Sequence, residues 1–201
     1  MELSLFLSLP ASIALLIGSE EIMSALFGYG QFDKNSVLNS ANALYYFSLG
    51  LPAFAMLKIF SNFFFANHDT KSPFYISLVS ILLNIFISLY FFKPIGFIII
   101  PIATTISSWF NLIVLFLILK KRNLFSFNAS FIKRFLKIIF ASALMGLFFN
   151  YLMTFFNEQL SFEHSLKSFY LIVSVVLGLG FYLIISYLMK AFQLEDIKLK
   201  Y

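Results

Sequence analysis

A lysine and an asparagine stand inside an otherwise apolar stretch of the sequence. Lys58 lies eight residues before the end of the run from Ala41 to Ala66, and Asn62 follows one helical turn later. Positions four apart share a helix face, so the two side chains could act together. An ammonium in mid-membrane costs about 2.5–3.5 kcal/mol on insertion scales, and less if the side chain reaches the interface. We expect one of two roles. Lys58 and Asn62 hold an anionic group in a cavity, or Lys58 only extends its ammonium to the membrane interface.

Neutral oxygen-bearing side chains on two further runs have the chemistry to ligate a small cation. Asn84 and Ser88 are four residues apart, and Thr104 begins a polar cluster in the following run. Hard cations take oxygen ligands, but the same residue types commonly form hydrogen bonds between helices. Both interpretations stay open because no carboxylate accompanies these residues. We expect no cofactor, and Na+ or the membrane potential is the candidate source of coupling.

The segment FANHDTKSP, residues 65–73, gathers charges between two apolar runs. Asp69 and Lys71 are expected to hold this turn at the membrane surface. Ser72 followed by Pro73 is typical of a helix start, because serine caps free N–H groups and proline has no N–H to satisfy. The competing explanation is an ordinary solvated loop. The presence of Lys58 in the preceding run is the observation that favours a functional role for the turn.

The sequence lacks the residue patterns of an enzyme or a nucleic-acid-binding protein. Cysteine is absent, which excludes thiolate–metal sites, and no glycine-rich phosphate loop or metal-spaced cluster occurs. The net charge of +5 comes from scattered residues, whereas nucleic acid needs a basic face. We expect no catalytic residues, no metal site and no nucleic-acid partner.

Composition places the chain in a lipid bilayer. It is 61% hydrophobic and 11% charged, against about 25% charged residues in ordinary soluble domains. Unbroken apolar runs of about 20 residues are typical of membrane helices, which satisfy their own backbone groups. The predicted fold is an all-α polytopic bundle of about six transmembrane helices. The runs are Leu3–Gly18, Ala41–Ala66, Pro73–Phe92, Gly96–Leu119, Phe135–Phe156 and Ser168–Met189.

Basic residues predict the orientation of this bundle. Ten of them fall in one set of alternate loops and ends and three in the other, and basic loops stay in the cytoplasm. We therefore expect both termini, including the tail QLEDIKLKY, to be cytoplasmic. The first set is Lys71, Lys120, Lys121, Arg122, Lys133, Arg134, Lys137, Lys190, Lys198 and Lys200, and the second is Lys34, Lys93 and Lys167.

The first run is short for a span, and Glu20 and Glu21 follow it at once. Either the glutamates lie at the outer interface or the helix begins upstream of Met1, and we favour the second. Prolines at positions 10, 52 and 101 are expected to kink three helices. Broken helices line cavities in many transporters, although proline is common in membrane helices generally.

The order of several motifs resembles the MurJ/MviN family of lipid II flippases, within the superfamily of multidrug, oligosaccharidyl-lipid and polysaccharide exporters. The matching stretches are LPASIAL, ALFGYGQFD, SLGLPAFAMLKIFSNFFFANHDTKSP and the basic loop KKRNLF. The resemblance implies that these runs are the last six of fourteen spans, in the C-terminal lobe of the transporter. Lys58, Asp69, Lys71 and Pro73 match motif positions of the family. Asn84 and Thr104 match a sodium site of relatives, but Ser88 stands where an acid is expected.

The resemblance also implies a function and a division of the chain. The expected substrate is an undecaprenyl-linked peptidoglycan precursor, moved across the bacterial inner membrane among membrane lipids. Residues 1–127 would be four core spans, and residues 128–201 the last two spans, which form a groove for the lipid tail, and a short cytoplasmic tail. Alone the chain is expected to be inactive, with the missing N-terminal lobe either a separate chain or absent. The alternatives are an exporter of another lipid-linked oligosaccharide or of drugs, a non-transporting membrane scaffold, or a decayed gene fragment.

Overall fold

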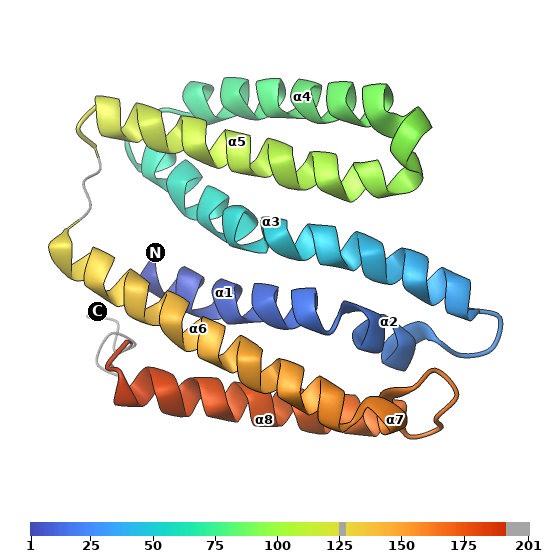
Figure 1. The fold of residues 1–201 in the computed structure, drawn as a ribbon. Coiled ribbons are helices and arrows are strands. Elements are labelled where there is room, and N and C mark those ends of the chain that lie inside the picture. The colour runs from blue at the N-terminus through green and yellow to red at the C-terminus, as the bar shows by residue number, and fades with distance from the viewer. Residues whose placement is uncertain (125–127, 192–201) are drawn as a thin grey trace.

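The computed structural model describes residues 1–124 and 128–191, and this part of the chain is built from helices and their connections (Figure 1). The long helices are α1 (Glu2–Ile17), α3 (Lys34–Ala66), α4 (Lys71–Ile95), α5 (Ile99–Lys121), α6 (Ala129–Phe155) and α8 (Lys167–Leu188). Shorter ones are α2 (Ser19–Phe27), the 3-10 turn η1 (Gly96–Ile98) and α7 (Asn157–Leu160). The predicted all-α bundle is confirmed.

Length and composition qualify four helical stretches as membrane spans, and a fifth if the bent pair α1 and α2 is one span. One of the four, Lys71–Lys121, is 51 residues long and reverses direction between α4 and α5, which lie side by side (Figure 1). The reversal passes through Gly96, whose φ of 76° is a conformation that residues with a Cβ rarely adopt. Counting α4 and α5 separately, and α1 with α2 as one span, gives six crossings, which agrees with the predicted number of about six.

The first run continues into a second helix that the sequence did not predict. After Gly18 the chain bends by 80° into α2, which carries Glu20 and Glu21 in its first turn. Together α1 and α2 are long and apolar enough to span a membrane, whereas α1 alone is too short. The bend therefore gives a candidate span within the described residues, and the expected helix start upstream of Met1 stays a prediction.

Two of the three expected proline sites lie in the interior of a helix, beyond its first turn. Pro10 is in α1 and Pro52 is in α3. Pro101 is the third residue of α5, where its missing N–H belongs to groups that have no helical partner anyway. The ring of Pro101 therefore breaks no helical hydrogen bond, and the kink expected there stays a prediction.

Two buried clusters hold the helices together, and both draw on α1. One joins α1 and α2 to α6 and α8, around Ile138, Phe149 and Tyr182. The other joins α1 to α3, α4 and α5, around Phe60 and Leu115. The expected division between residues 1–127 and 128–201 stays a prediction, since its boundary falls next to residues outside the described part.

Small residues on α6 and α8, Gly146 and Gly178, bring the helices into close contact. A Cβ on Gly146 would lie 2.6 Å from Cγ2 of Ile13 on α1, and one on Gly178 would lie 3.2 Å from the Phe149 ring on α6. Such close approach is typical of membrane helices.

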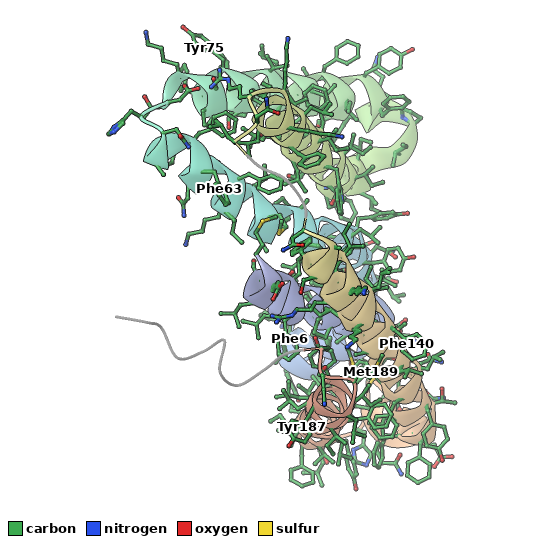
Figure 2. The ribbon with its side chains drawn as sticks, turned by 90° about the vertical axis from the view of Figure 1, so that its left-hand side faces the viewer. Phe6, Phe63, Tyr75, Phe140, Tyr187 and Met189 are labelled. Atoms are coloured by element: carbon green, nitrogen blue, oxygen red, sulfur yellow. The ribbon has the colours of Figure 1, made fainter. Side chains whose placement is uncertain are left out.

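Large apolar side chains cover the outside of the bundle. Figure 2 shows Tyr75, Phe140 and Tyr187 on the periphery, and Tyr187 is 71% exposed. A water-soluble monomer rarely exposes apolar surface on this scale, whereas contact with lipid tails requires it. The exposed residues and the helix lengths together make this a multi-pass membrane protein.

Candidate functional site

A polar groove runs between α4 and α5 and encloses about 250 Å³. Its lining includes Ser77, Ser80 and Asn84 from α4 and Thr104, Ser107, Ser108 and Asn111 from α5. On each helix these residues recur every three or four positions, which places them on one face. The groove therefore gathers three polar residues of α4 and four of α5 on facing surfaces.

Asn84 forms the expected hydrogen bonds between helices. Its Nδ2 donates to Oγ1 of Thr104 at 3.1 Å and to Oγ of Ser107 at 3.4 Å. The hydroxyls of Thr104 and Ser108 in turn donate to backbone carbonyls one turn earlier, which leaves their oxygens as acceptors toward the groove. The structure thus brings Asn84 and Thr104 together.

Ser88 and Asn111 differ from these partnered residues. Ser88 does not line the groove, and its buried Oγ has no hydrogen-bond partner in the described part of the chain. Asn111 donates through Nδ2 to Ser77 at 3.3 Å, while its buried Oδ1 is unpartnered. Asn111 was missed from the sequence, although its position, seven residues after Thr104, was a usable signal.

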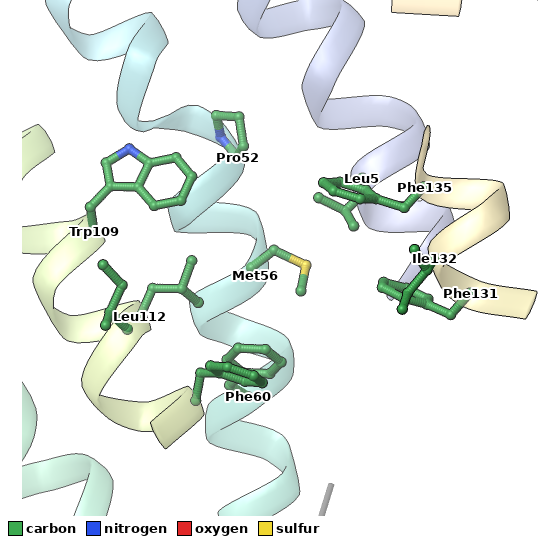
Figure 3. Close-up of a pocket in the computed structure, with 11 residues that line it drawn as sticks. Leu5, Pro52, Met56, Phe60, Trp109, Leu112, Phe131, Ile132 and Phe135 are labelled. Carbon is green, nitrogen blue, oxygen red and sulfur yellow. The ribbon is translucent and has the colours of Figure 1, made fainter. Parts of the chain in front are cut away.

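A second pocket, of about 390 Å³, lies where α6 faces α3 and α5 (Figure 3). In Figure 3, Met56, Phe60 and Trp109 lie on one side, and Leu5 and Ile132 on the other. The lining is Leu5, Pro52, Met56, Phe60, Trp109, Leu112, Ile113, Phe116, Phe131, Ile132 and Phe135. Its volume is typical of pockets that bind small molecules, about 300–1,000 Å³, and its apolar lining suits a hydrocarbon chain.

An ion pair ties α6 to α1 beside this pocket. Nη1 of Arg134 on α6 donates to Oε2 of Glu2 on α1 at 2.7 Å. Leu5 and Phe135, one residue or one turn away in sequence, line the pocket itself. In the sequence, Arg134 stands out only as a basic flanking residue, because nothing there pairs positions 132 residues apart.

Charged groups also hold the turn between α3 and α4. Asp69 accepts the N–H of Ser72 at 2.9 Å and its hydroxyl at 2.6 Å, and it pairs with Arg122 at the end of α5. Arg122 also donates to Oγ of Ser72 at 3.0 Å and lies over the Phe64 ring. The hydrogen bonds from Ser72, then the one from Arg122, hold the pKa of Asp69 well below its usual range.

This arrangement corrects two details of the predicted turn. Asp69, and not Ser72, caps the start of α4, because the aspartate oxygen accepts the N–H of Ser72. Pro73 is the third residue of α4 and not the first. Lys71 is exposed and makes no ion pair in the described residues; the partner of Asp69 is Arg122.

Lys58 and Asn62 lie together on the surface of α3. Both are exposed, and neither has a hydrogen bond or ion pair within the described residues. Lys58 is two positions from Met56 and from Phe60, so it points about 200° around the helix from these pocket residues. The expected pair therefore shares a face, and that face is turned away from the apolar pocket.

Comparison with known proteins gives a consistent set of relatives. The family model described as "Lipid II flippase MurJ" matches residues 1–191. Two relatives called probable lipid II flippase MurJ are 31% identical over 98% of the chain (Rickettsia prowazekii) and 34% identical over 96% of it (Thermotoga maritima). They are much longer proteins, since the chain spans 39% and 37% of their lengths.

A solved structure shares the fold. The chain called "Lipid II flippase MurJ, inward closed conformation" matches with a TM-score of 0.76 and 26% identity. The match covers 92% of this chain and 36% of that one. The six crossings described above thus correspond to about a third of a larger helical protein.

Proposed function

Because the chain belongs to the MurJ family of lipid II flippases, we propose that it forms the C-terminal part of a transporter that moves a lipid-linked peptidoglycan precursor across the bacterial inner membrane. The turn holding Asp69 and Arg122 faces the cytoplasm in this proposal, because most basic residues gather at that end. The N-terminus, which lies at the same end (Figure 1), is then cytoplasmic as well.

The apolar pocket is the observation that carries this proposal. It lies between α6 and the core helices α3 and α5, and apolar side chains line it completely. A polyprenyl tail is a chain of hydrocarbon units, so it gains dispersion contacts there without any polar group being desolvated. We assign the tail to this pocket and the headgroup to a cavity that further spans complete.

The exposed face of α3 is the proposed wall of that cavity. Lys58 and Asn62 lie on it without partners in the described residues. An ammonium in a water-filled cavity keeps its hydration and can attract a pyrophosphate, whereas the same group facing lipid would cost several kcal/mol. Transport therefore needs the spans that relatives carry beyond the length of this chain.

The polar groove between α4 and α5 is the proposed place for a coupling cation. Oγ1 of Thr104, Oγ of Ser108 and the unpartnered Oδ1 of Asn111 are acceptors that fit a small monovalent cation. Ser88 contributes no charge, so we propose weak Na+ binding at most, with the membrane potential supplying the remaining coupling.

A matched pair of substitutions on α6 tests the tail pocket. Ile132 lines the pocket, whereas Leu136, one turn further on and also exposed, does not. Ile132→Trp should fill the pocket and weaken polyprenyl phosphate binding at least about tenfold, which corresponds to about 1.4 kcal/mol. Leu136→Trp should leave binding unchanged. The measurement is native mass spectrometry of the purified chain with polyprenyl phosphate, and equal effects of both substitutions would remove the pocket from the mechanism.

A further inference from the structure

A second polar pocket lies at the opposite end of the bundle from the Asp69 turn. It holds about 220 Å³ between the first turn of α2, the start of α3 and the short helix α7. Glu20, Glu21 and Ser24 line it from α2, Lys34 from α3, and Asn157 and Ser161 from either end of α7. Neither the apolar pocket nor the groove between α4 and α5 shares any of these residues.

The charges in this pocket do not neutralise one another. It contains two carboxylates and one ammonium, and the ion pairs in the described part of the chain, Asp69–Arg122 and Glu2–Arg134, involve none of them. The pocket therefore keeps a net negative charge, which favours a cation.

Ser24 is a second, independent observation that points to ligand binding at this pocket. It is only 4% exposed, it lines the pocket, and its buried Oγ has no hydrogen-bond partner in the described residues. Leaving such a hydroxyl unpartnered costs about 1–3 kcal/mol. Ser24 lies one helical turn after Glu20 and Glu21, so the three side chains face the same region.

We propose that this pocket binds a hard divalent cation, Ca2+ or Mg2+, through the carboxylates of Glu20 and Glu21 and the hydroxyl of Ser24. Two carboxylates and a neutral oxygen are ligands that these ions prefer, with water completing the shell. All three ligands lie on α2, so the ion would hold the first two turns of this helix after the bend at Gly18, and the residues of α7 would only border the pocket. The proposal does not depend on lipid transport.

The charge of Lys34 gives the proposal a second, independent test. Its ammonium lines the same pocket without an ion pair, so it repels an incoming divalent cation. Removing that charge should tighten binding about three- to fivefold, as expected for a unit charge several ångströms from the ion in a largely aqueous setting. A purely structural lysine would give no such gain.

The test is calorimetric titration of the purified full chain in detergent micelles with CaCl2 and, separately, MgCl2, in buffer containing NaCl. The wild type should bind one ion of at least one of the two metals. Glu20→Gln combined with Glu21→Gln should weaken binding at least tenfold, Ser24→Ala severalfold, and Lys34→Gln should strengthen it.

Glu163→Gln is the matched control, because Glu163 is an exposed acid in the loop after α7 that does not line the pocket. Its binding should equal that of the wild type. The proposal is overturned if neither metal binds, or if Glu163→Gln weakens binding as much as the double variant. It is also overturned if Lys34→Gln, with helix content unchanged by circular dichroism, binds no more tightly than the wild type.

Discussion

Asp69 and Asp33 each cap the start of a helix, and Asp69 has an ion-pair partner in addition. Each carboxylate accepts the N–H of a serine three residues later, at 2.9 Å for Asp69 and 2.8 Å for Asp33. Only Asp69 also pairs with an arginine among the described residues. The Asp69 contact therefore joins two turns, whereas the Asp33 contact stabilises one helix start.

We predict that Asp69→Asn lowers the thermal midpoint of the purified chain more than Asp33→Asn does, and that the difference disappears in about 1 M NaCl. At that ionic strength the screening length is about 3 Å, so the ion pair is lost while the cap is retained. Differential scanning fluorimetry in detergent measures both variants. A difference that persists in high salt would mean that Arg122 does not contribute through its charge.

The pH dependence of the same contact has a defined sign. The pKa of Asp69 is lowered in the folded state, so its stabilising effect is complete above its unfolded value of about 3.9. That effect is lost as the pH falls through the lower folded value. Wild type and Asp69→Asn should therefore differ at pH 7 and converge only in strong acid.

Lys58 and Ser88 can be separated in one transport assay. In a full-length transporter carrying these six crossings, Lys58→Ala should slow lipid movement at every sodium concentration, because it removes a cavity charge. Ser88→Asp should make the rate sodium-dependent, because it adds a carboxylate one helical turn from Asn84, which lines the polar groove. Unchanged transport in Lys58→Ala, with normal insertion, would indicate a snorkelling lysine.

Residue types and spacing were enough to predict part of the site. The polar residues Asn84 and Thr104 and the capped helix start near Asp69 could be picked out from residue types and capping rules, although the capping residue is Asp69 and not the predicted Ser72. Arg122 and Arg134 were recognised as charges but not as partners, because their contacts join positions 53 and 132 residues apart. Such pairings depend on how helices stack, which a single sequence does not encode locally.

At the scale of elements, the approach of α6 to α1 depends on one glycine. We predict that Gly146→Ala destabilises the bundle by about 1–3 kcal/mol, because the new methyl group would lie 2.6 Å from Ile13 and force the helices apart. Gly180→Ala is the matched control on α8, since nothing lies within 4 Å of the added atom. Unfolding in denaturant measures both, and equal destabilisation would mean that packing against Ile13 is not limiting.

The long apolar helices could be predicted from the sequence, whereas the bend at Gly18 and the short helix after it could not. All six runs were found from hydropathy, because the membrane requires long apolar helices. The bend at Gly18 and helix α2 were missed, since the segment Ser19–Phe27 mixes two glutamates with apolar residues and resembles a loop. Tertiary contacts hold that segment in place. The hydroxyl of Ser168 donates to the carbonyl of Ala25, and the ammonium of Lys167 donates to the carbonyl of Gly28.

At the scale of the molecule, α1 is the element that unites the bundle. It packs against α3 on one side and α6 on the other, and both buried clusters include its residues. The apolar pocket opens where these two halves face each other near the Asp69 end, between α6 and the pair α3 and α5 (Figure 3). Movement of α6 relative to α3 would therefore change the pocket directly.

The number and direction of the crossings underlie every functional assignment made for this chain. The tail pocket, the cavity face of Lys58 and the polar groove all require α3, α4, α5 and α6 to cross the bilayer in alternating directions. The Asp69–Arg122 contact fixes two of the connecting turns at one end of the bundle. The sequence lacks cysteine, so single cysteines can report the side of each turn without background.

The most direct measurement is labelling of single cysteines with a membrane-impermeant maleimide, in intact cells and in inverted vesicles. Four exposed positions in loops or at helix ends are suitable for labelling. The variants are Thr70→Cys, Lys121→Cys, Gln31→Cys and Glu163→Cys. Thr70→Cys and Lys121→Cys should be labelled only in inverted vesicles, and Gln31→Cys and Glu163→Cys only in intact cells. Labelling of Thr70→Cys and Lys121→Cys from opposite sides of the membrane would contradict the six-crossing bundle and the transport function built on it.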